Sequence, residues 1–290
     1  MDLALATIIG DLWDSTLGGL WDDTEVFRTL FFDFELMGDS LDPLLDGFWF
    51  TVRLSIFSGV LSLTWGLVLA VMRQLPGRAL APVRALTIAY IDVLRGVPLL
   101  LVLLMISGGL GALAVEEAIP RELGIPRWLG LPDNFWYGVF ALTLTYGAYM
   151  AEVYRAGIEA VPGGQMEAAR SLGMSHGQAM RYVVVPQAVR KVIPPLLNDF
   201  IALMKDTSLV AFIGLAELIR VASDVQVETF NSSAYIPAGL FYLIATIPLA
   251  RWVDWLIARQ QERYTRAGAG GVAEPAPAGA AGTGQTGGPV

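Results

Sequence analysis

The sequence predicts an all-α membrane protein with five transmembrane helices and a large polar loop between the third and the fourth. Three observations support this prediction: 54% of the 290 residues are hydrophobic, the mean hydropathy is +0.55, and 16% of the residues are charged. Soluble domains contain about 25% charged residues, whereas apolar runs of about 18 residues or more are typical of membrane spans. The candidate spans are residues 47–72, 85–108, 135–154, 193–215 and 236–257.

The first and fourth candidates are the most and the least regular of these spans. Residues 47–72 contain one charged side chain, Arg53, which we interpret as an anchor near the outer interface. As a helix this segment would be about 39 Å long, which is enough to cross a bilayer core of about 30 Å with some tilt. The fourth candidate is interrupted by polar side chains, namely Asn198, Asp199, Lys205 and Asp206.

Composition excludes several classes of function. The chain has no cysteine, which removes disulfides and thiolate metal sites, and we interpret its one histidine, His176, as an exposed loop residue. A phosphate-binding Walker A loop needs a Gly-Lys pair, but the two lysines, Lys191 and Lys205, follow Arg190 and Met204. The pI of about 4.7 argues against nucleic acid as a partner. We therefore expect no catalytic residues, no metal and no cofactor bound by this chain.

Basic residues predict the orientation of the chain. Segments 73–84, 155–192 and 259–266 are rich in arginine and lysine, whereas the first 46 residues hold eleven acidic side chains and one arginine. Cytoplasmic loops of membrane proteins are enriched in Lys and Arg, so we expect the N-terminus outside and the C-terminus in the cytoplasm. The expected regions are an acidic extracytoplasmic extension, a membrane domain and a flexible cytoplasmic tail: 1–46, 47–258 and 259–290.

Both ends of the chain lie outside the predicted spans. Residues 24–37 are rich in aromatic side chains but carry too many charges to cross a membrane. Two interpretations are open for them, an external helix in the membrane interface or a loosely ordered extension. Residues 267–290 consist mainly of Gly, Ala, Pro and Thr, a composition typical of a flexible tail.

The loop between the third and fourth spans carries a regular spacing. Glu167-Ala168-Ala169 is followed after three residues by Gly173, and nine further residues separate Gly173 from the segment 183–186, Val-Val-Val-Pro. Pro162 suits the first turn of a helix, and Gly173 suits its end, where a positive φ is often needed. We expect Ala168, Ala169 and Leu172 to share one face of this helix.

A second short helix should follow in the same loop. Ser175 is a suitable N-cap, and we expect the helix to run to about Val185, where Pro186 stops its continuation. An ordinary amphipathic helix lying on the bilayer surface is the alternative interpretation of the loop as a whole.

This spacing resembles the cytoplasmic-loop signature of the membrane subunits of ATP-binding-cassette importers. The flanking segments 154–158 (Tyr-Arg-Ala-Gly-Ile), 186–190 (Pro-Gln-Ala-Val-Arg) and 205–209 (Lys-Asp-Thr-Ser-Leu) resemble those of the polar amino acid importer permeases in particular. The resemblance covers roughly residues 47–258. It implies that the loop docks in a groove of a separate ATPase subunit, through Gln165, Glu167, Ala168, Ala169, Arg170, Leu172 and Gly173.

The resemblance also implies the partners and the cellular location. ATP would be used by the partner ATPase subunits, and a second permease subunit, identical or paralogous, would complete the path. An extracytoplasmic solute-binding protein would deliver a polar amino acid, and the chain would lie in a bacterial plasma membrane. A secondary transporter or channel is the alternative within transport, and a membrane-embedded enzyme is the alternative from another class. The first usually needs inverted repeats, and the second needs catalytic motifs that are absent.

Ionisable side chains inside spans are costly and usually face an interior path. Arg95 lies in the second span beside Gly96 and Pro98, which should bend the helix, and the string resembles the Arg-Gly-x-Pro-Leu of family members. Arg95 is a candidate for the translocation path; alternatively it reaches the interface or pairs with Asp92. Glu152 and Arg155, three residues apart, are expected to form a structural ion pair.

The fourth span carries the remaining candidates for a translocation path: Asn198, Lys205, Asp206, Thr207 and Ser208. Lys205 would lie about 18 Å along a helix from Pro194, near the middle of the membrane. A zwitterionic amino acid needs a cation and an anion in its path, and Lys205 and Asp206 offer both. The alternative is a buried Lys205–Asp206 pair that stabilises the helix packing.

Overall fold

The structure, a computed structural model, describes residues 19–269, and residues 1–18 and 270–290 lie outside the described part. Between residues 19 and 269 the chain forms helices joined by short turns, and no strand occurs there. The α-helices are α2 (Gly19–Phe31), α3 (Phe34–Asp39), α4 (Leu41–Arg73), α5 (Ala81–Gly96), α6 (Leu99–Val115), α7 (Arg121–Gly124), α8 (Asp133–Glu159), α9 (Gly163–Ser171), α10 (His176–Ala179), α11 (Val185–Asp206), α12 (Leu218–Thr229) and α13 (Tyr235–Ala269). The shorter 3-10 and π segments are η2 (Trp128–Gly130), η3 (Met180–Val184), η4 (Thr207–Ile213) and η5 (Ser232–Ala234).

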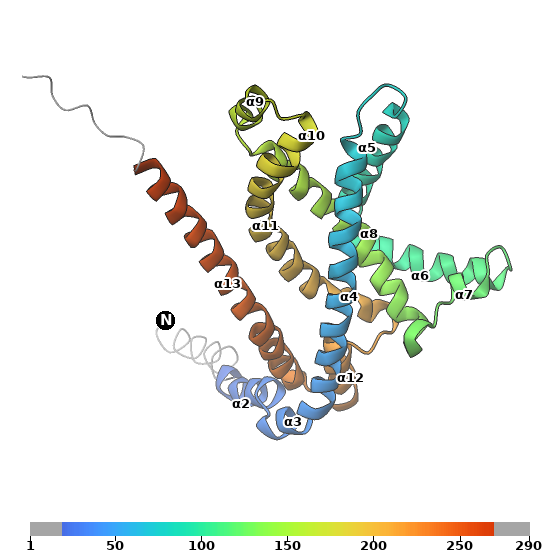
Figure 1. The fold of residues 1–290 in the computed structure, drawn as a ribbon. Helices are drawn as coiled ribbons and strands as arrows, with labels where there is room; N and C mark the ends of the chain where they lie inside the picture. Colours follow the sequence, from blue (N-terminus) through green and yellow to red (C-terminus); the bar gives the residue numbers. More distant parts are fainter. Residues whose placement is uncertain (1–18, 270–290) are drawn as a thin grey trace, which may run out of the picture.

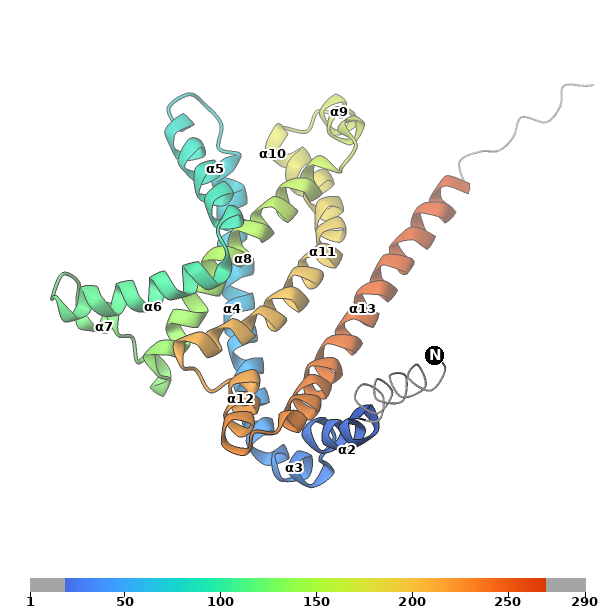
Figure 2. The same ribbon diagram turned by 180° about the vertical axis from the view of Figure 1, so that it is seen from behind.

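The long helices run back and forth between two ends of the molecule. Helices α9 and α10 lie at one end, together with the last turns of α4 and α8, and α2, α3 and α12 lie at the opposite end (Figure 1). Helix α13 diverges from α11 toward its C-terminus, as the reverse view also shows (Figure 2). This alternation places the arginine-rich segments 73–84 and 155–192 at the end with α9, and the acidic segment 19–46 at the other (Figure 1).

Among residues 19–269, two helices are long and apolar enough to cross a membrane on their own, α4 and the segment Ser232–Arg259 that contains most of α13. The pair α5 and α6 qualifies together but is bent by 107°. The bend falls at Gly96 and Pro98, as the sequence predicts, because the proline cannot continue the hydrogen-bonding of α5. Helix α13 extends beyond the expected boundary at residue 258 and reaches Ala269.

Helix α8 lies at the centre of the bundle and packs along α4. Small residues line this contact: a side chain added at Gly66 would place its Cβ 2.9 Å from the carbonyl oxygen of Gly147. A Cβ at Gly147 would in turn lie 2.6 Å from the Trp65 ring. The two helices therefore approach each other at backbone distance, as helices with small residues at their interface do in membranes. Around this contact lies the main apolar core, which includes Leu54, Phe135, Val139, Leu142, Leu203 and Val210.

The expected stop at Pro186 is wrong. The second loop helix is α10, four residues long, and it continues through the π-helical segment η3 into α11 without a break. Pro186 stands at the start of α11, directly after the π turn, so its missing N–H falls where the regular hydrogen-bonding pattern already changes. The wider π turn precedes the proline, and π turns absorb one extra residue within a continuous helix. Chain direction is therefore kept from α10 to Asp206.

The N-terminal segment is helical, as one of the two interpretations proposed. Residues 24–37 form the end of α2 and most of α3, with a break at Phe32 and Asp33. Asp33 is the N-cap of α3, and its carboxylate accepts hydrogen bonds from the backbone N–H groups of Glu35 and Leu36. The break between α2 and α3 is thus a turn, and the Asp33 side chain stabilises it as the N-cap of α3.

Candidate functional site

The loop with the regular spacing forms a small unit across the ends of α8 and α11. Pro162 precedes α9 as its N-cap residue. Beneath the loop, Val161, Val184 and Ala188 form a buried apolar cluster, on which Ile158, Met166 and Met180 pack. The loop is therefore fixed to the two helices by an apolar base of its own.

Gly173 ends α9 in the left-handed region that the sequence predicts, with φ = 85°. The N–H of Met174 donates to the carbonyl of Ala169, and the N–H of Gly173 donates to the carbonyl of Arg170. These two bonds form the Schellman arrangement that closes many helices. The Arg170 guanidinium also donates to the Met174 carbonyl, at 2.9 Å. The end of α9 is thus well defined by hydrogen bonds.

Ser175 caps α10, as the sequence predicts. Its hydroxyl accepts a hydrogen bond from the Gln178 N–H, and the Gln178 side chain accepts one from the Ser175 N–H, at 2.8 Å. Gln178 was missed in the sequence analysis, although Ser-x-x-Gln is the spacing of a capping box. Together with Gly173, this box fixes the turn between α9 and α10.

The three apolar residues expected on one face of α9 are divided between two sides. Ala169 is 4% exposed and faces the base of the loop, whereas Leu172 is 82% exposed and Ala168 is exposed as well. The expectation of a single face is therefore wrong for Ala169, because adjacent residues of a helix point in directions about 100° apart and Ala169 falls on the buried side. Glu167 is exposed, and the amide of Gln187 donates to the side chain of Gln165, at 3.3 Å. Glu167 and Ala168 of α9, and Leu172 directly after it, are thus accessible to a second protein.

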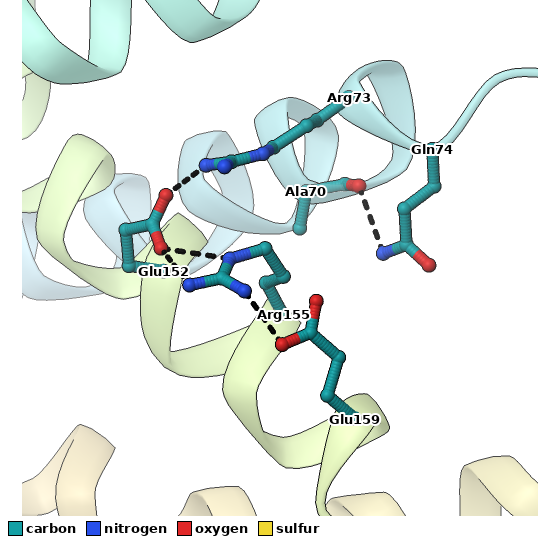
Figure 3. Close-up of polar contacts among 6 residues, drawn as sticks. All are labelled: Ala70, Arg73, Gln74, Glu152, Arg155 and Glu159. Carbon is teal, nitrogen blue, oxygen red and sulfur yellow. Dashed lines mark hydrogen bonds and ion pairs between the residues drawn. The ribbon is translucent and has the colours of Figure 1, made fainter. Parts of the chain in front are cut away.

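A network of ion pairs ties α4 to α8 below this loop (Figure 3). Glu152 lies between two arginines: Arg73 of α4 contacts one carboxylate oxygen, and Arg155 contacts the other at 2.7 Å. Arg155 also reaches Glu159, at 2.6 Å. The predicted Glu152–Arg155 pair is confirmed, but the participation of Arg73 from another helix could not be read from spacing within α8.

Arg95 lies at the break between α5 and α6, next to α8. Its guanidinium carbon lies 5.6 Å from the ring centroid of Tyr149, and the Tyr149 hydroxyl donates to the Arg95 carbonyl at 3.4 Å. Among the ion pairs of the described residues, none joins Arg95 to Asp92. The Arg95 side chain is exposed to the space beside α8.

Asp206 is held by a residue that the sequence analysis missed. The Tyr146 hydroxyl of α8 donates to Asp206 Oδ2 at 2.8 Å. Within the described part of the chain Lys205 forms no ion pair with Asp206, and Lys205 is exposed. The alternative of a buried Lys205–Asp206 pair is therefore wrong, because Lys205 is exposed and Asp206 is bonded to Tyr146 instead.

The other polar residues of α11 and η4 differ in accessibility. Asn198 is exposed and Ser208 is half-buried, whereas Thr207 is buried and its hydroxyl donates to the Met204 carbonyl at 2.7 Å. Asp199 Oδ2 is buried and lacks a hydrogen-bond partner among the described residues. Buried carboxylate oxygens are normally hydrogen-bonded, so Asp199 retains capacity to bind a donor.

Known proteins resemble this chain over most of its length. Residues 62–262 match the family described as binding-protein-dependent transport system inner membrane component. The probable glutamine ABC transporter permease protein GlnM of Bacillus subtilis is 35% identical over 230 residues, which cover 79% of this chain and 98% of the relative. The glutamate/aspartate import permease protein GltK of Escherichia coli is 34% identical over 229 residues, which cover 78% and 96%.

Solved structures of ABC transporters contain chains with a similar fold. The crystal structure of an amino acid ABC transporter with histidines contains a chain 34% identical to this one, with a TM-score of 0.67, covering 77% of this chain and 96% of the other. An inward-facing structure of the MetNI methionine ABC transporter shares the fold at 17% identity, with a TM-score of 0.61 and coverage of 76% and 96%.

Proposed function

This chain belongs to the family of binding-protein-dependent transport system inner membrane components, and we propose that it lines the path of an ATP-driven importer of polar amino acids. As a permease subunit it has no ATPase site of its own. The observation that carries the proposal is the unit formed by α9 and α10, because it presents Leu172 at one end of the bundle of long helices. The relatives named for glutamine and for glutamate and aspartate support the substrate class.

We further propose five spans, namely α4, the bent pair α5–α6, α8, α11 with η4, and α13. The alternating directions of these helices support this count (Figure 1). The end with α9 and α10 would be cytoplasmic, since the segments richest in arginine lie there. The chain would then begin outside and end inside, and α12 would face the solute-binding protein.

Helix α9 is suited to dock in a partner ATPase. Ala168 adds little bulk, so a second protein can approach the helix closely, and Leu172 offers an exposed apolar side chain to a pocket. The fixed turn at Gly173 and the apolar base under the loop would pass a movement of the ATPase to α8 and α11. This chain would thereby change from an inward-facing to an outward-facing state when ATP closes the ATPase pair.

The polar side chains along α11 are suited to line the path. An amino acid carries an ammonium group and a carboxylate, so a path for it needs both signs of charge. Asp199, with an unsatisfied carboxylate oxygen, and Asp206, held by Tyr146, offer acceptors, and Arg95 and Lys205 offer exposed cations. The remaining candidates for the path are Asn198, Thr207 and Ser208.

Glu167→Lys tests the docking proposal in the complex of permease, ATPase and binding protein. We expect the subunit to insert normally, because Glu167 is exposed, but to lose co-purification with the ATPase. His176→Lys is the control, since it adds charge to the exposed surface of the adjacent α10. Equal recovery of ATPase with both variants would show that α9 is an ordinary surface helix.

Lys205→Met tests the path in vesicles that hold the complete complex. Uptake of labelled Glu, Gln, Arg and His should be lost or change in preference, with normal assembly, because Asp206 keeps its bond to Tyr146 when Lys205 is removed. Lys191→Met is the control, since Lys191 contacts the Ala160 carbonyl beside the loop. Unchanged uptake and preference in Lys205→Met would remove Lys205 from the path.

A further inference from the structure

The helical segment 19–39 takes no part in the transport proposal, and it lies outside the residues 62–262 that match the family. It consists of α2 and α3 and lies at the end of the molecule opposite α9 (Figure 1). Ser40 alone separates α3 from Leu41, the first residue of the spanning helix α4. The segment is therefore placed at the level where α4 begins.

Hydrogen bonds dock this segment on the turn η5, which precedes α13. The Asn231 side-chain amide donates to the Thr29 carbonyl at 2.9 Å and to Asp33 Oδ2 at 3.4 Å. The Asp33 N–H donates to the hydroxyl of Ser233, which is buried, at 2.9 Å. Residues about 200 positions apart thus join the corner between α2 and α3 to the start of the last spanning helix.

The docked part of α2 has two different faces. Val26, Phe27, Leu30 and Phe31 follow the spacing of one helix face, and all four are exposed, Phe27 to 56%. The Phe27 and Phe31 rings stack at 4.9 Å between centroids. Apart from these four side chains, α2 is held through its backbone, since the Thr29 carbonyl accepts the hydrogen bond from Asn231. Contact with η5 therefore leaves the aromatic face free, and Phe32 and Phe34 at the corner are exposed beside it.

Three features indicate what covers this face. The segment is continuous with α4 and docked at the turn before α13, so it lies where two of the proposed spans leave the membrane, and α2 runs across the direction of α4 (Figures 1 and 2). Aromatic side chains are enriched at the headgroup level of bilayers, and a helix in that position lies in the plane of the membrane. The segment is acidic, because it carries one basic residue, Arg28, against six acidic ones, namely Asp22, Asp23, Glu25, Asp33, Glu35 and Asp39. Attraction to anionic headgroups is thereby excluded as the source of binding.

We propose that the aromatic face, Val26, Phe27, Leu30 and Phe31, lies in the headgroup region of the bilayer, and that Asn231 sets its rotation. Burial of apolar side chains drives the insertion, so it does not require anionic lipid. The occupant of the face is the lipid surface.

The test uses the full chain, which contains no cysteine, with single cysteines at Phe31 or Glu25 labelled with an environment-sensitive fluorophore. Glu25 is the matched control because it lies on the opposite side of the same helix. In phosphatidylcholine vesicles with lipids spin-labelled near the headgroup, we expect quenching at Phe31→Cys to exceed that at Glu25→Cys several-fold, at low and at high salt. Both leaflets carry the quencher, so the result is independent of orientation and of transport.

Equal quenching at the two positions would overturn the proposal. A second result would also overturn the proposal: weak quenching of Phe31→Cys by the lipids, together with protection of this position from a soluble quencher when a solute-binding protein is added. The face would then bind a protein partner. In the Phe31→Cys and Glu25→Cys backgrounds, Asn231→Ala should bring the quenching ratio toward one, whereas Ser232→Ala in the same turn should leave it unchanged. An unchanged ratio in Asn231→Ala would remove the role of Asn231.

Discussion

The contact between α4 and α8 and the loop formed by α9 and α10 are built in opposite ways. In the first, small residues bring two backbones together, and Glu152 joins Arg73 and Arg155 across the helices. In the second, a short helix rests on a small apolar cluster and exposes Leu172. The first region is built to resist deformation, and the second has the exposed surface that we propose as a docking site for the ATPase. Mutations in the first should therefore reduce stability, and mutations in the second should reduce coupling.

Gly66→Val should give the largest loss of stability. Its Cβ alone would lie 2.9 Å from the Gly147 carbonyl oxygen and from Met150 Cβ, so α4 and α8 must separate. Overpacking of this kind costs about 1–3 kcal/mol, and we expect about 3 kcal/mol because a backbone atom is involved. Thermal unfolding of the purified subunit in detergent measures it. Gly239→Val, with no atom within 4 Å, is the control, and equal melting temperatures would contradict the close approach.

Glu152→Ala should give the second largest loss of stability. We expect about 2 kcal/mol, a value between those typical of exposed and of buried ion pairs. The Glu152 side chain is 15% exposed, and its removal leaves Arg73 and Arg155 facing each other. Arg251→Ala is the control, because Arg251 is 80% exposed and its contact with Asp254 is 3.5 Å long. If both variants unfold at the same temperature, the network does not hold the two helices together.

Gly173→Val should cost about 1–2 kcal/mol locally, because L side chains are disfavoured at φ = 85°. We expect a small change in melting temperature and a large loss of ATPase co-purification. Gly164→Val serves as control, since Gly164 lies within α9, has open space around it and has no positive φ. Full ATPase recovery with Gly173→Val would mean that the end of α9 is not needed for docking.

Leu172→Ser should have the smallest effect on stability, within about 0.5 kcal/mol, as is usual for exposed positions. It should still weaken ATPase binding, since Leu172, directly after α9, is a large apolar side chain that is 82% exposed. Leu123→Ser, at an exposed leucine of α7, should change neither quantity. If Leu172→Ser lowers the stability but leaves ATPase binding unchanged, Leu172 supports the fold and is not part of the docking surface.

Local signals in the sequence predicted local structure well. The bend at Gly96 and Pro98, the helix end at Gly173 and the cap at Ser175 each depend on the conformational preference of one or two residues. The pair Glu152–Arg155 follows from helical spacing alone. These features need no knowledge of which helices are neighbours.

Contacts between helices could not be predicted in the same way. Arg73 joins Glu152, Tyr146 binds Asp206, and Asn231 binds the corner after α2, and each partner comes from a distant part of the chain. The sequence did not predict that the helix continues past Pro186. Proline usually ends a helix, but here a π turn, which no sequence signal indicated, precedes it. The pairing of Lys205 with Asp206 failed because adjacent residues on a helix diverge by about 100°.

The π turn at Met180–Val184 also fixes an angle. One residue added within a turn rotates every later side chain by about 100° about the helix axis, relative to an uninterrupted α-helix. Asp206 lies about six turns further along α11. Its hydrogen bond to the Tyr146 hydroxyl therefore depends on the rotation that the π turn introduces. The direction in which Asp206 points is therefore determined beside α10, at the other end of the same continuous helix.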